Sequence, residues 1–532
     1  MPTDCIPFKD TNYFSSLICD YLDENPDLKP FYNRFPNLEN FKAQIDTKRH
    51  SKSHRTVLVN VLKKQYQNVK SSSLTTQNIE ALKQENTFTI TTGHQLNLFT
   101  GPLYFLYKII STINLTKQLK EKYPDYNFVP IYWMATEDHD FDEINYFNFK
   151  GKKIHWNIES KGAVGKLNTN GLEDVCKIFS AELGQGENAD FLKDLFKNAY
   201  LKHNNLTEAT RYLANVLFKD YGLVILDANY SELKRLFIPF IKDELVSQTA
   251  YKKVVETSKR LNSLTPNYKI QINPREINLF YLKDNLRERI VEKDGNYFVN
   301  ETNISWSKSE ILKEVNDFPE RFSPNVIMRP LYQEVVLPNL CYIGGGAELA
   351  YWLELKDYFE AVNVAFPVLL LRNSVLIKTE KQTQKLDKLN LSLNDIFLKQ
   401  SDLVNQQIKK LSSIDIDFTS QKEFLKKQFK DLYTLAEQTD KSFLGAVAAQ
   451  EKKQIKGLNN LENRLLKAQK RKLSEQVERI TSLQNELFPR QSLQERNLNF
   501  SELYLQYGMQ LIPKLIQELK PLKGEFLIVT LF

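Results

Sequence analysis

Four residues with the chemistry of a ligand site follow an extended run of the sequence. The run TFTIT occupies residues 87–91, and Thr92, Gly93, His94 and Gln95 come directly after it. Gly93 allows the backbone to approach a ligand closely, and the imidazole of His94 can give a hydrogen bond or exchange a proton. We therefore predict that Thr92, Gly93 and Gln95 bind a substrate and that His94 is catalytic. The alternative, equally compatible with so short a motif, is that His94 only satisfies a buried backbone group.

A second group of ionisable residues ends an apolar run. The sequence FVPIYWMAT is followed by Glu137, Asp138 and His139. The next acidic residues are Asp140, Asp142 and Glu143. Because burying ionisable groups without partners is costly, packing alone does not explain the cluster. We predict that Asp138 and His139 are catalytic acid or base groups and that Glu137 binds substrate. A solvated acidic loop or a helix-capping aspartate is the alternative.

A third group lies where a strand-like run enters a glycine corner and then a helix. The sequence CYIGGGAELAYW contains six predicted substrate-binding residues: Gly344, Gly345, Gly346, Glu348, Tyr351 and Trp352. A corner of this kind at a helix start is suited to phosphate or carboxylate. The G-x-G-x-x-G spacing of dinucleotide sites is absent, and a purely structural turn is the alternative.

Two arginines near these motifs are further candidates. Arg329 precedes Pro330 in MRPLYQE, and Arg372 and Asn373 follow the apolar run AFPVLLL. Either guanidinium can hold an anionic substrate through two hydrogen bonds, and we predict that Arg329, Arg372 and Asn373 bind substrate. The alternative is that each arginine forms an ion pair between elements of the fold.

The elements that position these residues alternate between strands and helices. Runs rich in β-branched and aromatic residues predict strands at residues 87–91, 128–134, 221–227, 337–343 and 366–371. Between the first two runs, residues 102–123 begin with Pro102 and are apolar on most faces, which predicts a buried crossover helix. The pattern predicts an α/β fold with a Rossmann-like parallel sheet, whose strands place their carboxyl ends at one ligand-binding edge.

The predicted core, residues 1–375, contains two polar, turn-rich segments. Residues 151–219 and 251–317 are interpreted as inserted connecting modules that wall a pocket. The second contains VEKDGNYFV, where Asp294 and Gly295 between strand-like flanks predict a hairpin turn.

Long helices with little glycine or proline follow the core, over residues 376–488. Leucines and isoleucines at heptad-like spacing predict one helix, and a turn near residues 412–419 separates it from a longer second helix ending near Leu487. The seam residues are Leu386, Leu389, Leu393, Ile396 and Leu403 in the first helix and Leu458, Leu461, Leu465 and Ala468 in the second. We predict an antiparallel coiled-coil arm, with simple packing of helices against the core as the alternative. Residues 489–532 are predicted to return to the core.

Composition limits the classes of function. The net charge of +7 arises from 72 basic and 65 acidic residues, a small excess that favours solvated lysine-rich helices over nucleic-acid binding. The four cysteines lack C-x-x-C spacing, so we expect neither a disulfide framework nor a zinc site. The amino terminus lacks the pattern of a signal peptide, and the longest apolar run, residues 365–371, is too short to cross a bilayer. We expect a cytoplasmic protein without membrane contact.

Four motifs in order resemble one family. They are TGHQxxxFTGP at residues 92–102, EDHDFDEIN at 137–145, RPLYQE at 329–334 and GGGAELAYW at 344–352. Together they resemble the bacillithiol biosynthesis cysteine-adding enzymes, the cysteine ligase BshC family, over nearly the whole chain. Gly346 departs from that pattern, in which proline is expected at the third position of the corner.

The resemblance implies a Rossmann-like core with connecting-peptide inserts, a coiled coil that forms a homodimer, and a ligase that adds L-cysteine to the amine of glucosaminyl malate in the last step of bacillithiol synthesis. The core also resembles that of class I aminoacyl-tRNA synthetases and related nucleotidyltransferases, with His94 near their histidine signature. Their signature lysine loop is not recognisable here. Because amide formation from a free carboxylate is unfavourable in water, we expect a nucleotide to activate the carboxylate, and ATP is the simplest candidate. No metal site is recognisable.

The mechanism inferred from these residues has three parts. His94, Gln95 and the glycine corner hold the activated carboxylate or phosphate, Asp138 or His139 takes the proton from the attacking ammonium, and an arginine holds the malate carboxylates. Two other functions remain open. One is a nucleotidyltransferase with another acceptor, such as RNA, although the acidic cluster is expected to repel phosphates. The other is a dimeric coiled-coil scaffold that only binds a nucleotide.

Overall fold

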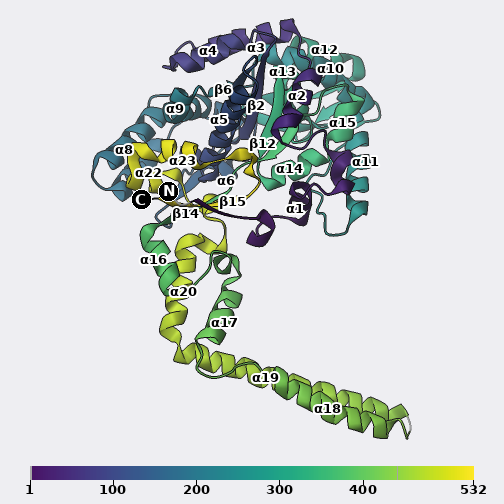
Figure 1. The fold of residues 1–532 in the computed structure, drawn as a ribbon. Coiled ribbons are helices and arrows are strands. Elements are labelled where there is room, and N and C mark those ends of the chain that lie inside the picture. Colours follow the sequence, from purple (N-terminus) through teal and green to yellow (C-terminus); the bar gives the residue numbers. More distant parts are fainter. Residues whose placement is uncertain (1–2, 440, 532) are drawn as a thin grey trace. The chain divides into compact units, whose positions relative to one another are not determined.

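The computed structural model describes residues 3–439 and 441–531 and divides them into two compact units. The core unit comprises residues 3–9, 13–376 and 493–529, and the helical unit comprises residues 10–12, 377–492 and 530–531. Both are drawn as ribbons in Figure 1.

A five-stranded parallel sheet forms the centre of the core unit. Its order is β13-β12-β2-β3-β6, and all four neighbouring pairs are parallel. The strands are β2 (Thr87–His94), β3 (Asn127–Met134), β6 (Val224–Asp227), β12 (Asn339–Gly344) and β13 (Val368–Leu371). Each predicted run overlaps one of these strands, although β2 continues three residues beyond its run and β6 begins three residues later than expected. The predicted α/β, Rossmann-like fold is confirmed.

Helices cover both faces of this sheet. Figure 1 shows α5 (Tyr104–Lys122) and α9 (Leu206–Phe218) on one side and α13 (Met328–Val336) and α14 (Gly346–Leu353) on the other. Helix α5 is the predicted crossover between β2 and β3, and it begins two residues after Pro102. Its Leu115 and Leu119 pack in one buried cluster with Ile90 of β2 and Ile343 of β12. Burial on both faces fits strands that are rich in apolar residues and, in β2, in threonine.

The strand order reverses beside β2. From β2 the chain runs outward through β3 and β6, and it then returns to the opposite side of β2 to form β12 and β13. The register pairs His94 with Met134 and Met134 with Asp227, so these carboxyl ends lie at one edge. Ligands of open α/β sheets bind outside the carboxyl ends at such a switch point.

The terminal segments complete the core unit. Strand β15 (Phe526–Leu531) pairs antiparallel with β1 (Thr3–Ile6). The helices of these segments are α1 (Ser16–Leu22), α2 (Leu38–Thr47), α3 (Lys52–Tyr66), α4 (Ser73–Ala81), α21 (Gln494–Asn497), α22 (Phe500–Tyr507) and α23 (Leu511–Glu518).

The first inserted segment is mainly helical rather than turn-rich. After the short antiparallel pair β4 (Tyr146–Phe149) and β5 (Lys152–His155), it forms α7 (Leu172–Leu183), α8 (Glu187–Tyr200) and the helix α9. Its polar residues occupy exposed helix faces, whereas Phe179, Leu192 and Phe196 are buried. Amphipathic helices of this kind produce a polar composition without an irregular backbone.

The second inserted segment contributes an antiparallel sheet of order β10-β9-β8-β7-β11. Asp294 and Gly295 join β8 to β9, both with positive φ (50° and 80°), as the predicted two-residue hairpin requires. The elements inside the predicted segment are β7 (Leu279–Lys283), β8 (Leu286–Lys293), β9 (Asn296–Val299), β10 (Ser305–Ser307) and α12 (Lys308–Asp317). Helix α10 (Ser231–Ser247) precedes it, α11 (Thr249–Leu264) begins two residues before its predicted start, and β11 (Phe322–Pro324) follows it.

The helical unit is divided into more helices than the two that were predicted. Its helices are α16 (Glu380–Lys388), α17 (Gln400–Leu411), α18 (Thr419–Ala436), α19 (Lys441–Lys472) and α20 (Ser474–Leu487). The first predicted helix is broken because Asn390 has a positive φ of 49° and Ser392 and Asp395 exchange hydrogen bonds that form a turn. Side chains of this type compete with helical backbone hydrogen bonds.

The antiparallel pair of this unit is α18 with α19. Tyr433 donates to Glu451 at 2.8 Å and Lys422 pairs with Glu462 at 2.5 Å. Residue numbers therefore increase along one helix in the direction in which they decrease along the other. The buried residues of the pair are Phe429, Ala436 and Val447. The predicted seam is wrong at Leu461, which is 53% exposed. Within the described ranges of both units, no helix has the length and apolarity needed to span a membrane.

Candidate functional site

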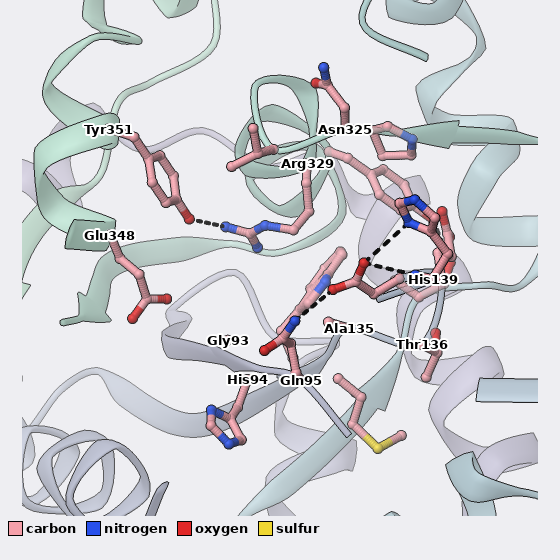
Figure 2. A pocket seen from close by; sticks show the side chains of 18 of the residues that line it. Gly93, His94, Gln95, Ala135, Thr136, His139, Asn325, Arg329, Glu348 and Tyr351 are labelled. Atoms are coloured by element: carbon pink, nitrogen blue, oxygen red, sulfur yellow. Dashed lines mark hydrogen bonds and ion pairs between the residues drawn. The ribbon is translucent and has the colours of Figure 1, made fainter. Parts of the chain in front are cut away.

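A cavity of about 720 Å³ opens at the switch point of the central sheet. Strand ends β2 and β3, the start of α14, and strands β7 and β8 all contribute to its wall. Twelve of the predicted site residues line it: Gly93, His94, Gln95, Glu137, Asp138, His139, Arg329, Gly345, Gly346, Glu348, Tyr351 and Arg372. Figure 2 shows Arg329 and Tyr351 on one side of this cavity and Gln95, Ala135 and His139 on another.

His94 is a neutral, buried ring at the end of β2. It is only 7% exposed and packs against Tyr104 and Phe105 of α5, with ring centroids 5.6 and 5.0 Å away. Burial, and then the nearby Lys108 charge, lower its pKa to about 3. A hydrogen bond to the Thr100 backbone opposes this shift, and the buried Nε2 atom has no partner among the described residues. His94 therefore bonds a backbone group with one nitrogen, while its other nitrogen is buried without a partner among the described residues.

Lys108 and Glu348 form a buried ion pair beside His94. Lys108 Nζ lies 2.6 Å from Glu348 Oε2 and donates to the Gly93 carbonyl at 2.7 Å. The Glu348 carboxylate also accepts from the Gly345 N–H at 2.8 Å and from the Tyr342 hydroxyl at 2.6 Å. Burial opposes its charge, but Lys108 and these donors lower the pKa of Glu348. Because Glu348 occupies the Gly345 amide, the glycine corner is less open to an anion than its sequence suggests.

The acidic cluster after β3 is paired with cations from other segments. Glu137 lies 2.7 Å from the fully buried Lys234 of α10. Asp138 accepts from Gln95 Nε2 at 2.9 Å and from the His139 N–H at 2.8 Å. Burial raises the pKa of Asp138, but the His139 side chain, whose Nδ1 lies 3.6 Å away, the two hydrogen bonds and the Arg287 charge hold this pKa well below its usual range. Asp138 is therefore ionised and a weak proton acceptor.

Arg287 contacts the ring of His139. Its guanidinium lies 2.6 Å from His139 Nδ1 and 4.0 Å from the centroid of the Phe280 ring. Arginine only donates hydrogen bonds, so Nδ1 is the acceptor in this contact.

The two predicted arginines have different environments. Arg372 is 2.7 Å from Glu495, and both side chains are buried, so it forms the ion pair between elements that was the alternative for it. Arg329 donates to Gln333 at 3.1 Å and to the Tyr351 hydroxyl at 3.4 Å, as Figure 2 shows for Tyr351. Among the described residues, no carboxylate lies within ion-pair distance of Arg329.

Two family models match this sequence along almost its entire length. The model described as "Bacillithiol biosynthesis BshC, N-terminal Rossmann-like domain" matches residues 1–373. The model described as "Bacillithiol biosynthesis BshC, C-terminal coiled-coil domain" matches residues 375–531. The chain belongs to the bacillithiol biosynthesis BshC family. The resemblance found in the four motifs is thereby confirmed.

Full-length relatives carry the same family name. A protein named "Putative cysteine ligase BshC" from Flavobacterium johnsoniae is 64% identical over 100% of both chains. A protein of that name from Cytophaga hutchinsonii is 38% identical over 97% of this chain and 96% of its own length. One from Bacillus cereus strain B4264 is 30% identical over 94% and 95%. The family assignment therefore covers both units.

Four predicted site residues of this BshC-family chain lie behind the cavity wall. The Thr92 hydroxyl donates to the Ile343 carbonyl at 2.7 Å, and the ring of Trp352 stacks on Tyr342 at 4.7 Å. Asn373 accepts from Ser111 at 3.0 Å. Gly344 ends β12, where an added Cβ would lie within about 3 Å of neighbouring side chains. Their neighbours are protein groups, so direct substrate binding by Thr92, Gly344, Trp352 and Asn373 is not supported.

Several cavity residues lie outside the motifs. Lys108 was detectable in principle, because it is a lysine within the otherwise apolar face of the predicted crossover helix. Arg287 and Arg289 are two positions apart on β8 and therefore share one face of that strand. The remaining polar or aromatic lining residues outside the predictions are Tyr104, Trp133, Thr136, Asn273, Arg275, Phe280, Asn325, Tyr332, Tyr342 and Arg496.

The lining is positively charged overall. It contains three carboxylates, Glu137, Asp138 and Glu348, and seven cations: Lys108, Arg275, Arg287, Arg289, Arg329, Arg372 and Arg496. The expectation that the acidic cluster repels phosphates therefore does not hold at this site. Within the described part of the chain, no group of three or more His, Cys, Asp or Glu residues is placed to bind a metal ion.

Proposed function

We propose that this chain is a ligase that joins the carboxyl group of L-cysteine to the amine of glucosaminyl malate in the last step of bacillithiol synthesis. The relatives named as cysteine ligases support the reaction class. The observation that carries the acceptor is Arg329, a cavity-lining cation without a carboxylate partner among the described residues. A guanidinium of this kind suits the malate carboxylates, whereas Arg372 is already neutralised by Glu495.

Asp138 has an electrostatic role in this proposal. Its ionised carboxylate, fixed by Gln95, attracts the ammonium group of the acceptor. Proton transfer to His139 is less favoured, because Nδ1 already accepts from Arg287. The neutral His94 ring, with Nε2 free, binds a hydrogen-bond donor of the substrate. The remaining work of the site is to hold the amine and the activated carboxyl carbon together.

Amide formation from a free carboxylate in water requires activation, and ATP is the activating nucleotide we propose. The cavity offers a fit for its phosphates, because Arg275 and Arg289 have no hydrogen bond or ion pair from their side chains among the described residues. When bound, ATP would convert a carboxyl oxygen of the substrate into a phosphate-linked leaving group. The C–O bond to that oxygen breaks as the amine nitrogen forms the new C–N bond.

The test is product formation by the purified chain. L-cysteine, glucosaminyl malate and ATP are incubated with the protein, and bacillithiol is measured by mass spectrometry. Loss of one charge-assisted contact in Arg329→Met should raise the KM for glucosaminyl malate about 10- to 100-fold. The exposed Arg49, replaced in the same way, is the matched control. An unchanged KM in Arg329→Met would remove Arg329 from the acceptor site, and no product from any variant would remove the ligase assignment.

We also propose that the helical unit forms a homodimer, in a cytoplasmic protein whose four cysteines are unpaired. Phe424, Leu432, Leu435 and Leu461 of the α18–α19 pair are 41–65% exposed, an apolar surface that a second copy would cover. Light scattering should show a dimer that Phe424→Asp and Leu435→Asp convert to a monomer. A wild-type monomer at micromolar concentration would refute this interface.

A further inference from the structure

A second cavity of about 300 Å³ lies next to the first in the core unit. The two share Gln95, Tyr104 and Arg496 as lining residues, so they adjoin at that point. The second cavity is formed by the loop that follows Gln95, by Glu143 after β3, and by Asn148 of β4. The loop contains the FTGP part of the first family motif, which the proposed function leaves without a role.

Two residues that line this cavity, Asn97 and Asn148, have an amide oxygen without a partner among the described residues. Asn97 donates from Nδ2 to the Glu143 carbonyl at 3.2 Å, and Asn148 donates from Nδ2 to the Asn497 carbonyl at 3.0 Å. Because each amide nitrogen donates to a carbonyl, the orientation of each amide is fixed and Oδ1 is the remaining atom. Both Oδ1 atoms are buried without a hydrogen-bond donor among the described residues, and Asn97 is only 7% exposed. Buried acceptors without donors are rare in native proteins and indicate a missing donor.

The loop that presents Asn97 is held in a strained conformation. Phe99 and Thr100 have φ of 47° and 69°, unusual for residues with a side chain. The Phe99 N–H donates to the Tyr200 hydroxyl at 2.7 Å, and Asn499 Nδ2 donates to the Phe99 and Gly101 carbonyls at 2.7 Å each. Strain that is maintained by surrounding contacts is concentrated at functional sites.

The second cavity also contains one carboxylate, from Glu143, and one guanidinium, from Arg496. The Glu143 carboxylate accepts from Gln95 at 2.9 Å, and Glu143 lines the same cavity as Asn97. Arg496 is exposed at the junction of the two cavities and has no ion-pair partner within the described ranges. Acceptor oxygens and a carboxylate suit an ammonium group, which carries only donors, and the arginine suits a carboxylate.

We propose that this second cavity binds the free amino acid substrate, with its α-ammonium at Asn97, Asn148 and Glu143 and its α-carboxylate at Arg496, facing the main cavity. The assignment rests on the proposed function for the identity of the amino acid, L-cysteine. It places the carboxyl carbon at the junction, where the activating nucleotide and the acceptor amine reach it from the main cavity.

The test measures binding, separately from turnover. The purified full-length chain is titrated calorimetrically with L-cysteine, with 3-mercaptopropionate, which lacks the ammonium, and with cysteamine, which lacks the carboxylate. Wild type should bind L-cysteine at least tenfold more tightly than either analogue. Asn148→Leu and Asn97→Leu should weaken L-cysteine binding at least tenfold and leave 3-mercaptopropionate unchanged, whereas Arg496→Met should weaken both of these acids. The exposed Asn157, replaced by leucine, is the matched control.

Each outcome decides the inference. If the asparagine variants weaken 3-mercaptopropionate as much as L-cysteine, or raise the KM for glucosaminyl malate instead, the ammonium assignment is overturned. If wild type makes bacillithiol but Asn148→Leu and Asn97→Leu, folded by circular dichroism, keep the KM for L-cysteine, the proposed function stands and this site does not. If L-cysteine binds as expected but no bacillithiol forms, the site stands and the acceptor assignment fails.

Discussion

Replacing Lys108 with methionine leaves the Glu348 carboxylate without its cation inside the core unit. The two side chains are 5% and 26% exposed and 2.6 Å apart, so solvent only partly replaces the lost partner. The Gly345 N–H and Tyr342 hydroxyl still donate to Glu348, but the Gly93 carbonyl loses the Lys108 donor. Breaking one partner of a buried ion pair costs about 3–5 kcal/mol, and we expect about 3 kcal/mol here because two donors remain.

The double variant separates the ion pair from the packing of each side chain. Glu348→Gln removes the charge and keeps an acceptor, so Lys108→Met with Glu348→Gln should cost about 2 kcal/mol less than the two single changes added together. Urea unfolding followed by tryptophan fluorescence reports the core unit alone, because it contains all four tryptophans: Trp133, Trp156, Trp306 and Trp352.

The exposed pair Asp174 and Lys177 of α7 is the control for this cycle. Its side chains are 79% and 77% exposed at a distance of 2.8 Å, and exposed pairs of this kind contribute little, so no coupling should be resolved. Additive effects of the Lys108 and Glu348 changes, within experimental error, would refute the ion pair as a coupled element of the site.

Three further predictions concern the same unit. Burial raises the pKa of Glu244 to about 7, so the folded state holds this proton more tightly than the unfolded chain does. The free energy of unfolding should therefore fall by about 3 kcal/mol as pH rises from 4.5 to 7. Urea unfolding should show this slope in the wild type and not in Glu244→Gln. The pKa of His94 is lowered to about 3, so its contribution is complete above pH 6.5 and should decline by up to about 5 kcal/mol toward pH 3; His94→Phe should flatten this acid limb. An added Cβ at Gly101, where φ is +62°, would lie 2.6 Å from Asn97 Cβ, so Gly101→Ala should lower the melting temperature, and an unchanged value would contradict the tight loop.

The strands and their shared edge were predictable from sequence because each is a short run rich in β-branched, aromatic or other apolar residues between helical patterns. Strands buried on both faces need such runs, and parallel pairing then places His94 and the residues after Met134 side by side without further information. The breaks in the helical unit were less visible. The spacing from Leu386 to Leu403 is helical, but the positive φ of Asn390 depends on one short polar turn.

The partners of the site residues could not be derived from sequence. Glu137 pairs with Lys234, which is 97 residues away, and Arg372 pairs with Glu495, which is 123 residues away. Such distances close only when the inserted segment and the carboxyl-terminal return pack on the sheet. For this reason the alternatives for Arg329 and Arg372 were indistinguishable in sequence, although the structure gives only Arg372 an ion pair.

The charge of the cavity follows from this pairing of distant segments. Each carboxylate at the sheet edge has a cation nearby from another segment: Glu348 has Lys108, Glu137 has Lys234, and Asp138 has Arg287. The motifs alone are acidic, yet their charge is balanced locally, and the arginines that remain without carboxylate partners determine the sign of the potential that a ligand meets. A site built in this way favours anionic substrates while it keeps an ionised carboxylate for an amine, which is the combination that the proposed reaction requires.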